Sequence, residues 1–172
     1  MISPKDLQGL GASIVGAARE GVALAQYLVH SGARVTLHDA RPQTAWSKDL
    51  GPLEARGLRL ALGWAPPDLL DVDILFLSPG VPPSAPLVQQ ARQRGVPISS
   101  EPRLFTQSCA APVVGITGSS GKTTTTSLTG KMYEASGISA WVGGNIGVPL
   151  TEYLSRPERP DVAVMELSSF QL

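Results

Sequence analysis

A glycine-rich segment, residues 117–124, carries the side chains best suited to chemistry. It reads TGSSGKTT and lies between an apolar run at 112–116 and a helical pattern at 123–135. A turn of this kind between a strand and a helix cradles phosphates, because its backbone N–H groups and the helix N-terminus face an anion. The segment therefore predicts a site for a nucleoside triphosphate, with ATP as the expected ligand.

The side chains of this segment suggest how the phosphates would be held. Lys122 is placed to reach the terminal phosphates, and the hydroxyl of Thr123 can ligate Mg²⁺. The match to the general pattern G-x-x-x-x-G-K-S/T is a variant one, because Ile116 stands where the first glycine would be. The alternative is a glycine- and serine-rich turn with a surface lysine. The residues expected to bind ATP are Gly118, Ser119, Ser120, Gly121, Lys122, Thr123 and Thr124.

A second glycine turn, GAAREG, occupies residues 16–21. It approximates the dinucleotide fingerprint G-x-G-x-x-G, in which an acid about 20 residues further on binds ribose hydroxyls. Asp39 stands near that distance, but Ala18 replaces the middle glycine and adds a methyl group where a pyrophosphate would approach. The turn therefore predicts either a nucleotide site or glycines that serve packing alone, with Asp39 as a strand-end or capping residue.

The composition argues against several classes of protein. The 172 residues are 42% hydrophobic and carry no net charge, which favours a packed core over a broad nucleic-acid surface. The one cysteine, Cys109, allows no disulfide within the chain and suits a reducing compartment. No apolar run approaches the roughly 20 residues of a membrane span. We therefore expect a cytoplasmic protein that binds neither nucleic acid nor a membrane.

Short apolar runs alternate with helical patterns along the chain, which predicts an α/β fold. We expect a Rossmann-like domain with a parallel sheet, followed by the start of a P-loop domain. The proline-rich segment 79–86 predicts a loop. The expected strands are 13–15, 34–37, 58–62, 73–77, 96–98, 113–116, 140–142 and 162–167. The expected helices are 22–29, 85–94, 101–108 and 123–135.

The segment CAAP at residues 109–112 is the expected boundary between two domains. Residues 1–110 would form the first domain, and residues 111–172 an incomplete second one. The second part has only about 60 residues, near the lower limit for an independent fold. We therefore expect this chain to be the N-terminal part of a longer protein.

Several segments together resemble the Mur ligases. The glycine turn at Gly16, the strand end at 39–41 and the turn at 78–80 fit the first domain of that family. The most discriminating segment is the ELSSFQL run at the end of the chain, and the resemblance covers nearly the whole sequence. The segments that carry it in the second domain are GITGSSGKTT at 115–124, VGGNIGVP at 142–149 and ELSSFQL at 166–172.

The resemblance implies a three-domain enzyme. Its first domain binds a uridine nucleotide, its second binds ATP with Mg²⁺, and its third, absent from this chain, supplies the amino-acid site. The implied activity is ATP-dependent addition of D-glutamate to UDP-N-acetylmuramoyl-L-alanine through an acyl phosphate, in peptidoglycan synthesis. We expect the enzyme to be a monomer and this chain alone to be inactive as a ligase.

The resemblance also assigns roles to single residues. Lys122 and Glu166 are the expected catalytic residues: Lys122 bridges the β- and γ-phosphates, and Glu166 binds Mg²⁺ together with Thr123. The alternatives are a lysine-paired carboxylate for Glu166, a left-handed turn for Asn145, and capping hydroxyls for the two serines that follow Leu167. The residues expected to bind the substrate are Arg19, Glu20, Asp39, Arg41, Gly80, Asn145, Ser168 and Ser169.

Two other functions stay open at this point. One is an NAD-binding module fused to a P-loop nucleotide switch, and Ala18 counts against it. The other is a ligase of the same superfamily that adds another amino acid such as L-alanine, and the ELSSFQL run counts against that. His30 and His38 receive no role, and we expect His38 to be a strand residue.

Overall fold

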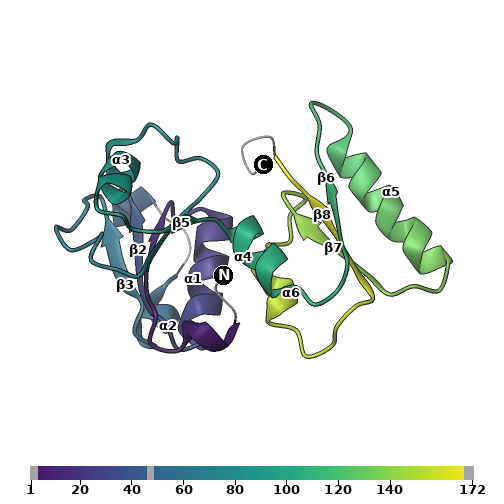
Figure 1. Ribbon diagram of the computed structural model, residues 1–172, viewed down its shortest axis with the longest axis horizontal. Coiled ribbons are helices and arrows are strands. Elements are labelled where there is room, and N and C mark those ends of the chain that lie inside the picture. The colour runs from purple at the N-terminus through teal and green to yellow at the C-terminus, as the bar shows by residue number, and fades with distance from the viewer. Residues whose placement is uncertain (1–3, 46–48, 169–172) are drawn as a thin grey trace. The chain divides into compact units, whose positions relative to one another are not determined.

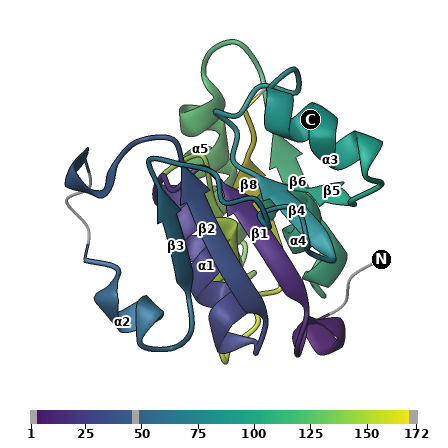
Figure 2. The same cartoon turned by 90° about the vertical axis from the view of Figure 1, so that its left-hand side faces the viewer.

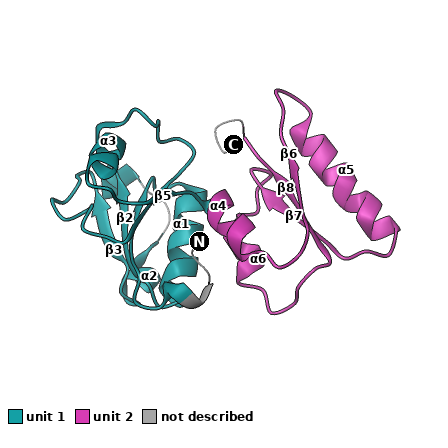
Figure 3. Ribbon diagram, viewed as in Figure 1, with its two compact units in different colours: residues 1–101 teal, residues 102–172 magenta. Residues whose placement is uncertain are grey.

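Helices and strands alternate along the chain (Figure 1), as the sequence predicts. The computed structural model describes residues 4–45 and 49–168. Its contacts divide the chain into two compact units, 1–101 and 102–172, coloured separately in Figure 3. Along the sequence, the division between the units falls within helix α4 (Glu101–Ser108). The division into functional domains at residues 110 and 111 stays a prediction.

The first unit is built on a five-stranded parallel sheet with the strand order β3-β2-β1-β4-β5. In this arrangement all five strands end at the same edge of the sheet (Figure 2). The strands are β1 (Gly11–Val15), β2 (Arg34–Asp39), β3 (Arg59–Leu62), β4 (Ile74–Leu77) and β5 (Ile98–Ser99). The helices are η1 (Pro4–Leu7), α1 (Arg19–His30), η2 (Gln43–Ala45), α2 (Gly51–Glu54) and α3 (Pro86–Gln93).

The core of the first unit forms where apolar strand residues meet α1 and α3. Helix α1 lies against β1 and β2 and buries its apolar stripe there. Helix α3 contributes Ala91 to a buried cluster with Val15, Leu70 and Leu75. All five residues of β1 are buried, as expected for the central strand of a sheet covered on both faces. This core fixes the strand ends that carry the predicted nucleotide residues.

The second unit is built on a three-stranded parallel sheet with the order β6-β8-β7. The last strand in sequence is therefore the central strand. Helix α5 covers one face of this sheet, and α4 and α6 cover the other (Figure 1). The elements are β6 (Val113–Ile116), α5 (Lys122–Ala135), β7 (Ala140–Gly144), α6 (Leu150–Leu154) and β8 (Val162–Glu166).

Three aromatic rings join α4, β7 and α6. The ring centroid of Phe105 lies 5.8 Å from that of Trp141 and 5.4 Å from that of Tyr153. Trp141 and Tyr153 are themselves 5.4 Å apart in an edge-to-face arrangement, and all three side chains are buried. Aromatic pairs of this geometry add about 0.5–1.5 kcal/mol beyond the area they bury. This cluster makes α4 part of the second unit.

The predicted α/β fold is confirmed, and the differences from the expected elements are local. The fifth strand begins at Ile98 and not at Val96, because the Val96 N–H donates to the Ala91 carbonyl (2.9 Å) and closes α3. The loop expected at 79–86 extends to Ala85, and Pro86 opens α3, where its missing N–H costs nothing. The short helices α2 and α6 were not predicted, because four or five residues show too little periodicity.

None of the helices in the described ranges combines the length and the apolar character needed to cross a membrane.

Gly130 gives a direct test of the packing between α5 and β7. A methyl group at this buried position would overlap the Val142 side chain, whose β-branched geometry leaves it little freedom to move. We expect Gly130→Ala to lower the free energy of unfolding by about 1–2 kcal/mol, because overpacking outweighs the gain of about 1 kcal/mol in helix propensity. Chemical denaturation measures the change.

Leu128→Ala, on an exposed position of the same helix, is the matched control and should change stability little. Adding Val142→Ala to Gly130→Ala removes the overlapping methyl groups and should restore part of the loss. An unchanged or higher stability for Gly130→Ala alone would contradict the packing described here.

Candidate functional site

The carboxyl ends of β6, β7 and β8 meet at one edge of the second sheet. The glycine-rich loop follows β6, Asn145 follows β7, and Glu166 is the last residue of β8. The backbone ties these ends together, because the Leu167 N–H donates to the Ile116 carbonyl (2.8 Å) and the Asn145 N–H to the Glu166 carbonyl (3.0 Å). This edge therefore brings together predicted residues that are far apart in sequence.

Glu166 is the centre of this edge. Its side chain is only 2% exposed, yet both carboxylate oxygens have a donor. The Thr123 hydroxyl donates to Oε2 (2.9 Å), and the Asn145 side-chain amide donates to Oε1 (3.0 Å). Neither of these two partners is a lysine, so the contacts of the described residues do not support the lysine-paired alternative. The buried carboxylate instead connects the phosphate loop to the loop after β7.

Gly144 allows Asn145 to approach Glu166. Its φ is +92°, and a Cβ there would lie 2.5 Å from the Glu166 carbonyl oxygen. No non-glycine residue in the described ranges has a positive φ, so Asn145 is not the left-handed turn residue of the alternative interpretation. Gly144 lies in the VGGNIGVP segment but is not among the predicted site residues. The GG dipeptide before the asparagine was the available signal.

The loop at 117–121 is exposed and presents the N-terminus of α5. Gly121 precedes the helix with φ +73°, and Gly118 has φ +153°, so both turns depend on glycine. Having no side chain, Gly121 cannot cap α5, and the N–H groups of the first turn stay available to an anion. The Lys122 ammonium folds back over the loop and donates to the Gly118 carbonyl (2.8 Å). This geometry is that of a phosphate cradle.

The chemistry of the donors at this edge also suits Mg²⁺. The described residues contain no cluster of three or more His, Cys, Asp or Glu side chains able to hold a metal. Magnesium needs no such cluster, because it commonly uses one or two protein oxygens together with substrate phosphates and water. The paired oxygens of Thr123 and Glu166, beside the phosphate loop, fit that requirement.

In the first unit the glycine turn at Gly16 packs closely against the start of the loop after β4. Gly16 has φ +99°, and a Cβ on it would lie 2.7 Å from the Ser78 Cβ. The Ser78 hydroxyl donates to the Gly16 carbonyl (2.8 Å). A Cβ on Gly21 would overlap the same carbonyl. These glycines therefore serve packing, whatever ligand the turn binds, and Ser78 is a positioning residue that the sequence analysis did not single out.

Asp39 and Arg41 form a paired group at the end of β2. Asp39 Oδ1 accepts from the Nε (3.0 Å) and the backbone N–H (3.0 Å) of Arg41, and Oδ2 accepts from its guanidinium (3.1 Å) and from the Ala17 N–H (2.9 Å). Four donors fill the roughly four lone-pair sites of a carboxylate. The side chain of Arg41 is 55% exposed and that of Asp39 is 10% exposed. Arg41 is therefore the member of the pair that faces solvent.

These donors set the acidity of Asp39. Burial alone would raise its pKa, but the hydrogen bonds from the Arg41 side chain and from the backbone N–H groups of Arg41 and Ala17 outweigh burial. The pKa of Asp39 falls from 3.8 to about 2. The carboxylate is thus held ionised, which keeps Arg41 in place.

The other residues predicted in the first unit lie around the same edge. Arg19 is the exposed first residue of α1, and Glu20 beside it is half-buried. Burial raises the pKa of Glu20, and the charge of Arg19 partly offsets this. Gly80 is exposed in the loop after β4, and nothing lies within 4 Å of a Cβ built on it, so packing does not explain this glycine. His38 is a buried residue of β2 whose Nδ1 bonds to the Ala61 carbonyl (2.8 Å), as expected for a strand residue.

Of the two predicted serines after β8, Ser168 is half-buried beyond Leu167. Ser169 lies outside the described residues.

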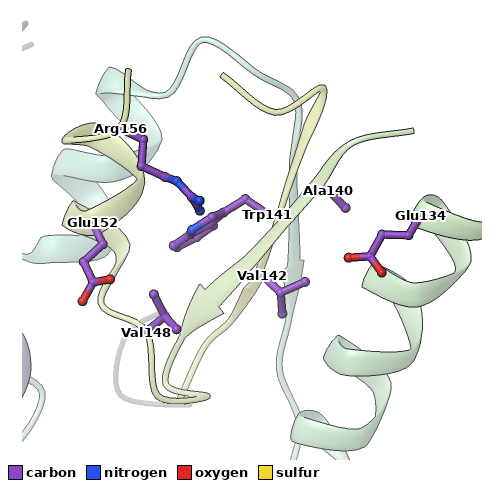
Figure 4. Close-up of a pocket in the computed structure, with 7 residues that line it drawn as sticks. All are labelled: Glu134, Ala140, Trp141, Val142, Val148, Glu152 and Arg156. Atoms are coloured by element: carbon purple, nitrogen blue, oxygen red, sulfur yellow. The ribbon is translucent and has the colours of Figure 1, made fainter. Parts of the chain in front are cut away.

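An open pocket of about 540 Å³ borders β7 away from the phosphate loop. In Figure 4, Arg156 reaches toward the Trp141 ring, and Glu134 and Glu152 lie on opposite sides of the strand. None of the predicted site residues is among those that line it. This pocket is therefore separate from the predicted site residues at the strand ends.

Two family models match the chain in sequence. Residues 11–100 match the Mur ligase MurD-like N-terminal domain, and residues 116–172 match the Mur ligase middle domain. The first match alone covers more than half of the chain. The chain belongs to the Mur ligase family.

Two curated relatives show what this Mur ligase chain is similar to. The UDP-N-acetylmuramoylalanine–D-glutamate ligase of Desulfatibacillum aliphaticivorans is 41% identical over 97% of this chain, and that of Symbiobacterium thermophilum is 44% identical over 94%. The chain spans 37% and 36% of the lengths of these two proteins. A murein peptide ligase from Psychrobacter arcticus shares the fold, with a TM-score of 0.58, 20% identity, and coverage of 94% of this chain and 39% of its own.

Because the pKa of Asp39 is lowered on folding, the free energy of unfolding of this Mur ligase chain should fall at low pH. The folded pKa of about 2 lies below the unfolded value of 3.8, so the stabilisation is complete above about pH 4 and is lost as the pH falls through 2. We expect a contribution on the order of 1–2 kcal/mol, below the full linkage value because Arg41 is half-exposed. Asp39→Asn should remove this contribution, so the difference between the unfolding free energies at pH 5 and at pH 2.5 should be smaller in the variant than in the wild type.

Asp68→Asn is the matched control, since Asp68 also pairs with an arginine but both side chains are about half exposed. Its effect should be smaller and screened by salt. An Asp39→Asn variant with the same acid dependence as the wild type would contradict the assignment.

Proposed function

We propose that this chain forms the uridine-nucleotide domain and part of the ATP domain of an ATP-dependent D-glutamate ligase. The substrate is UDP-N-acetylmuramoyl-L-alanine, and the setting is peptidoglycan precursor synthesis in the cytoplasm. The observation that carries the proposal is the contact of Thr123 and Asn145 with the buried carboxylate of Glu166, beside the phosphate loop. Relatives with this activity in their names, at 41–44% identity, support it.

The proposed reaction solves a general problem of amide synthesis. A carboxylate is a poor acyl donor, because its charge repels nucleophiles and an oxide ion cannot leave. In the proposed reaction a carboxylate oxygen of the substrate attacks the γ-phosphorus of ATP, and ADP leaves. The amine of D-glutamate then attacks the acyl phosphate carbon, and phosphate leaves as the amide forms. Phosphoryl transfer of this kind depends on positioning and charge neutralisation.

The residues of the second unit divide this work. The backbone N–H groups of residues 118–124 and the Lys122 ammonium hold the phosphates and offset their charge. Thr123 and Glu166 are the residues that would hold Mg²⁺, which when bound adds a positive charge beside the transferred phosphate. Asn145, which Glu166 orients through its amide, would face the muramyl substrate together with Ser168 and Ser169.

In the first unit, Arg41 and the turn at Gly80 would contact the uridine nucleotide, with Arg19 and Glu20 at the start of α1. Asp39 acts in this proposal mainly through Arg41, because its own lone pairs already have donors. The same saturation counts against the alternative of an NAD-binding module. In that class the strand-end acid must accept bonds from ribose hydroxyls.

Binding of the uridine nucleotide is the direct test. Calorimetric titration of the 172-residue chain with UDP-N-acetylmuramoyl-L-alanine or UDP should show saturable binding, and NADH should show none. A folded sample that binds NADH but no uridine nucleotide would overturn the proposal in favour of the NAD-binding module.

Lys122 offers a test of the ATP site. In a protein of the relatives' full length that carries this sequence, Lys122→Ala should abolish D-glutamate addition and leave uridine-nucleotide affinity within a few-fold. The reason is that Lys122 lies in the second unit and the proposed uridine site in the first. A coupled ADP-release assay and calorimetry measure the two quantities.

Lys131→Ala is the matched control, because Lys131 lies on the same helix and pairs with Glu134 (2.7 Å). It should keep ligase activity. Loss of both activity and uridine binding in Lys122→Ala would mean that Lys122 supports folding and has no specific role in phosphate binding.

A further inference from the structure

Trp64 is the most exposed aromatic side chain in the described ranges. The residue is 58% exposed, whereas Trp141, Phe76 and Phe105 are buried. It follows β3 at the edge where the strands of the first sheet end. In open α/β sheets this edge is where ligands bind. An exposed indole at this edge therefore indicates a role in ligand binding.

The turn that carries Trp64 packs against the Asp39–Arg41 turn. The Gly63 N–H donates to the Asp39 carbonyl (2.8 Å). Gly63 has φ +86°, and a Cβ on it would lie 3.4 Å from the Pro42 Cα. A glycine is thus favoured where the two turns meet, and Trp64 is the next residue.

Backbone contacts place the turn that carries Trp64 beside the turn that carries Arg41. Asp39 pairs with Leu62 in the parallel ladder of β2 and β3. The bond from the Gly63 N–H to the Asp39 carbonyl is the last of this ladder, and the close approach of Gly63 to Pro42 keeps the two turns adjacent beyond it. The exposed guanidinium of Arg41 and the exposed indole of Trp64 are therefore carried by adjacent turns at this rim of the sheet.

Two features restrict the backbone around Trp64 although its side chain is exposed. Two prolines follow at 66 and 67, and the first restricts Ala65 to an extended conformation. The base of the loop is closed by Arg59, which forms two bonds to Asp68 (2.6 and 3.1 Å). A ring on a restrained loop loses little entropy when a ligand covers it. These are the properties of a preformed stacking surface.

We propose that Trp64 stacks on the base of the uridine nucleotide. The indole would supply a flat apolar face for the pyrimidine ring, beside the turn that carries Arg41. The inference rests on the proposed function, because it requires that the first unit bind a uridine nucleotide. It adds a base-contacting residue on β3, outside the glycine turn and the ends of β2 and β4.

The test compares ligands with and without a base on the 172-residue chain. Base–aromatic stacking predicts that Trp64→Ala weakens UDP binding roughly 10-fold. Trp64→Phe keeps an aromatic ring and should stay within about three-fold. Ribose 5-phosphate, which has no base, should bind all three proteins with the same affinity. Leu128→Ala, equally exposed but in the second unit, is the matched control.

Fluorescence gives a second readout that does not depend on affinity. UDP should quench the tryptophan emission of the wild type, and the quenching should disappear in Trp64→Phe although UDP still binds. Circular dichroism and the unfolding midpoint verify that each variant is folded.

The two proposals fail in different ways. If the wild type binds no uridine nucleotide, both are wrong. If the wild type binds UDP and Trp64→Ala binds it equally well, or if Trp64→Phe keeps the quenching, the stacking role is wrong and the proposed function stands.

Discussion

The second unit depends on one buried carboxylate. Glu166 is removed from water, and an unpaired charge at such a place would cost several kcal/mol. The hydroxyl and amide of Thr123 and Asn145 make that burial tolerable, and in doing so they fix the phosphate loop and the β7 loop in relation to each other. The close backbone approach that this requires explains the glycine at position 144. Local geometry at three strand ends thus follows from satisfying one charge.

The first unit also has a hydrogen-bonded carboxylate at the end of a strand. Asp39 also ends a strand, and it too accepts an N–H from a neighbouring glycine-containing turn. Its partner, however, is the guanidinium of Arg41, so the charge is neutralised within the group. The second unit therefore holds the carboxylate of Glu166 with neutral donors, which suits a cation. The first unit presents the guanidinium of Arg41, which Asp39 holds in place. The difference in partner chemistry matches the difference in proposed ligands.

The sequence predicted the parallel α/β fold and most of its elements, because apolar strands and glycine turns leave clear local patterns. The phosphate loop was predicted from a local pattern of glycines, lysine and threonine, and Glu166 from the family resemblance and its place at a strand end. What could not be predicted depends on contacts across the fold. The saturation of Asp39 needs the Ala17 N–H from another strand end, and the bonds of Ser78 and Gly144 need their distant partners in place. Trp64 gave no signal in sequence, because its exposure and the contacts of its turn with Asp39 and Pro42 appear only in the fold.

The strand order of the second unit has a consequence for how the chain folds. Among the described residues, β6 and β7 do not pair with each other, and each pairs with β8, which is synthesised after both. Neither of these two strands can form its ladder with β8 before the ribosome has reached residue 162. Strand pairings between residues this distant in sequence slow folding, because loop-closure entropy is lost before the contacts form. The bond from Thr123, at the end of the phosphate loop, to Glu166 can consequently form only after synthesis has passed the loop by some forty residues.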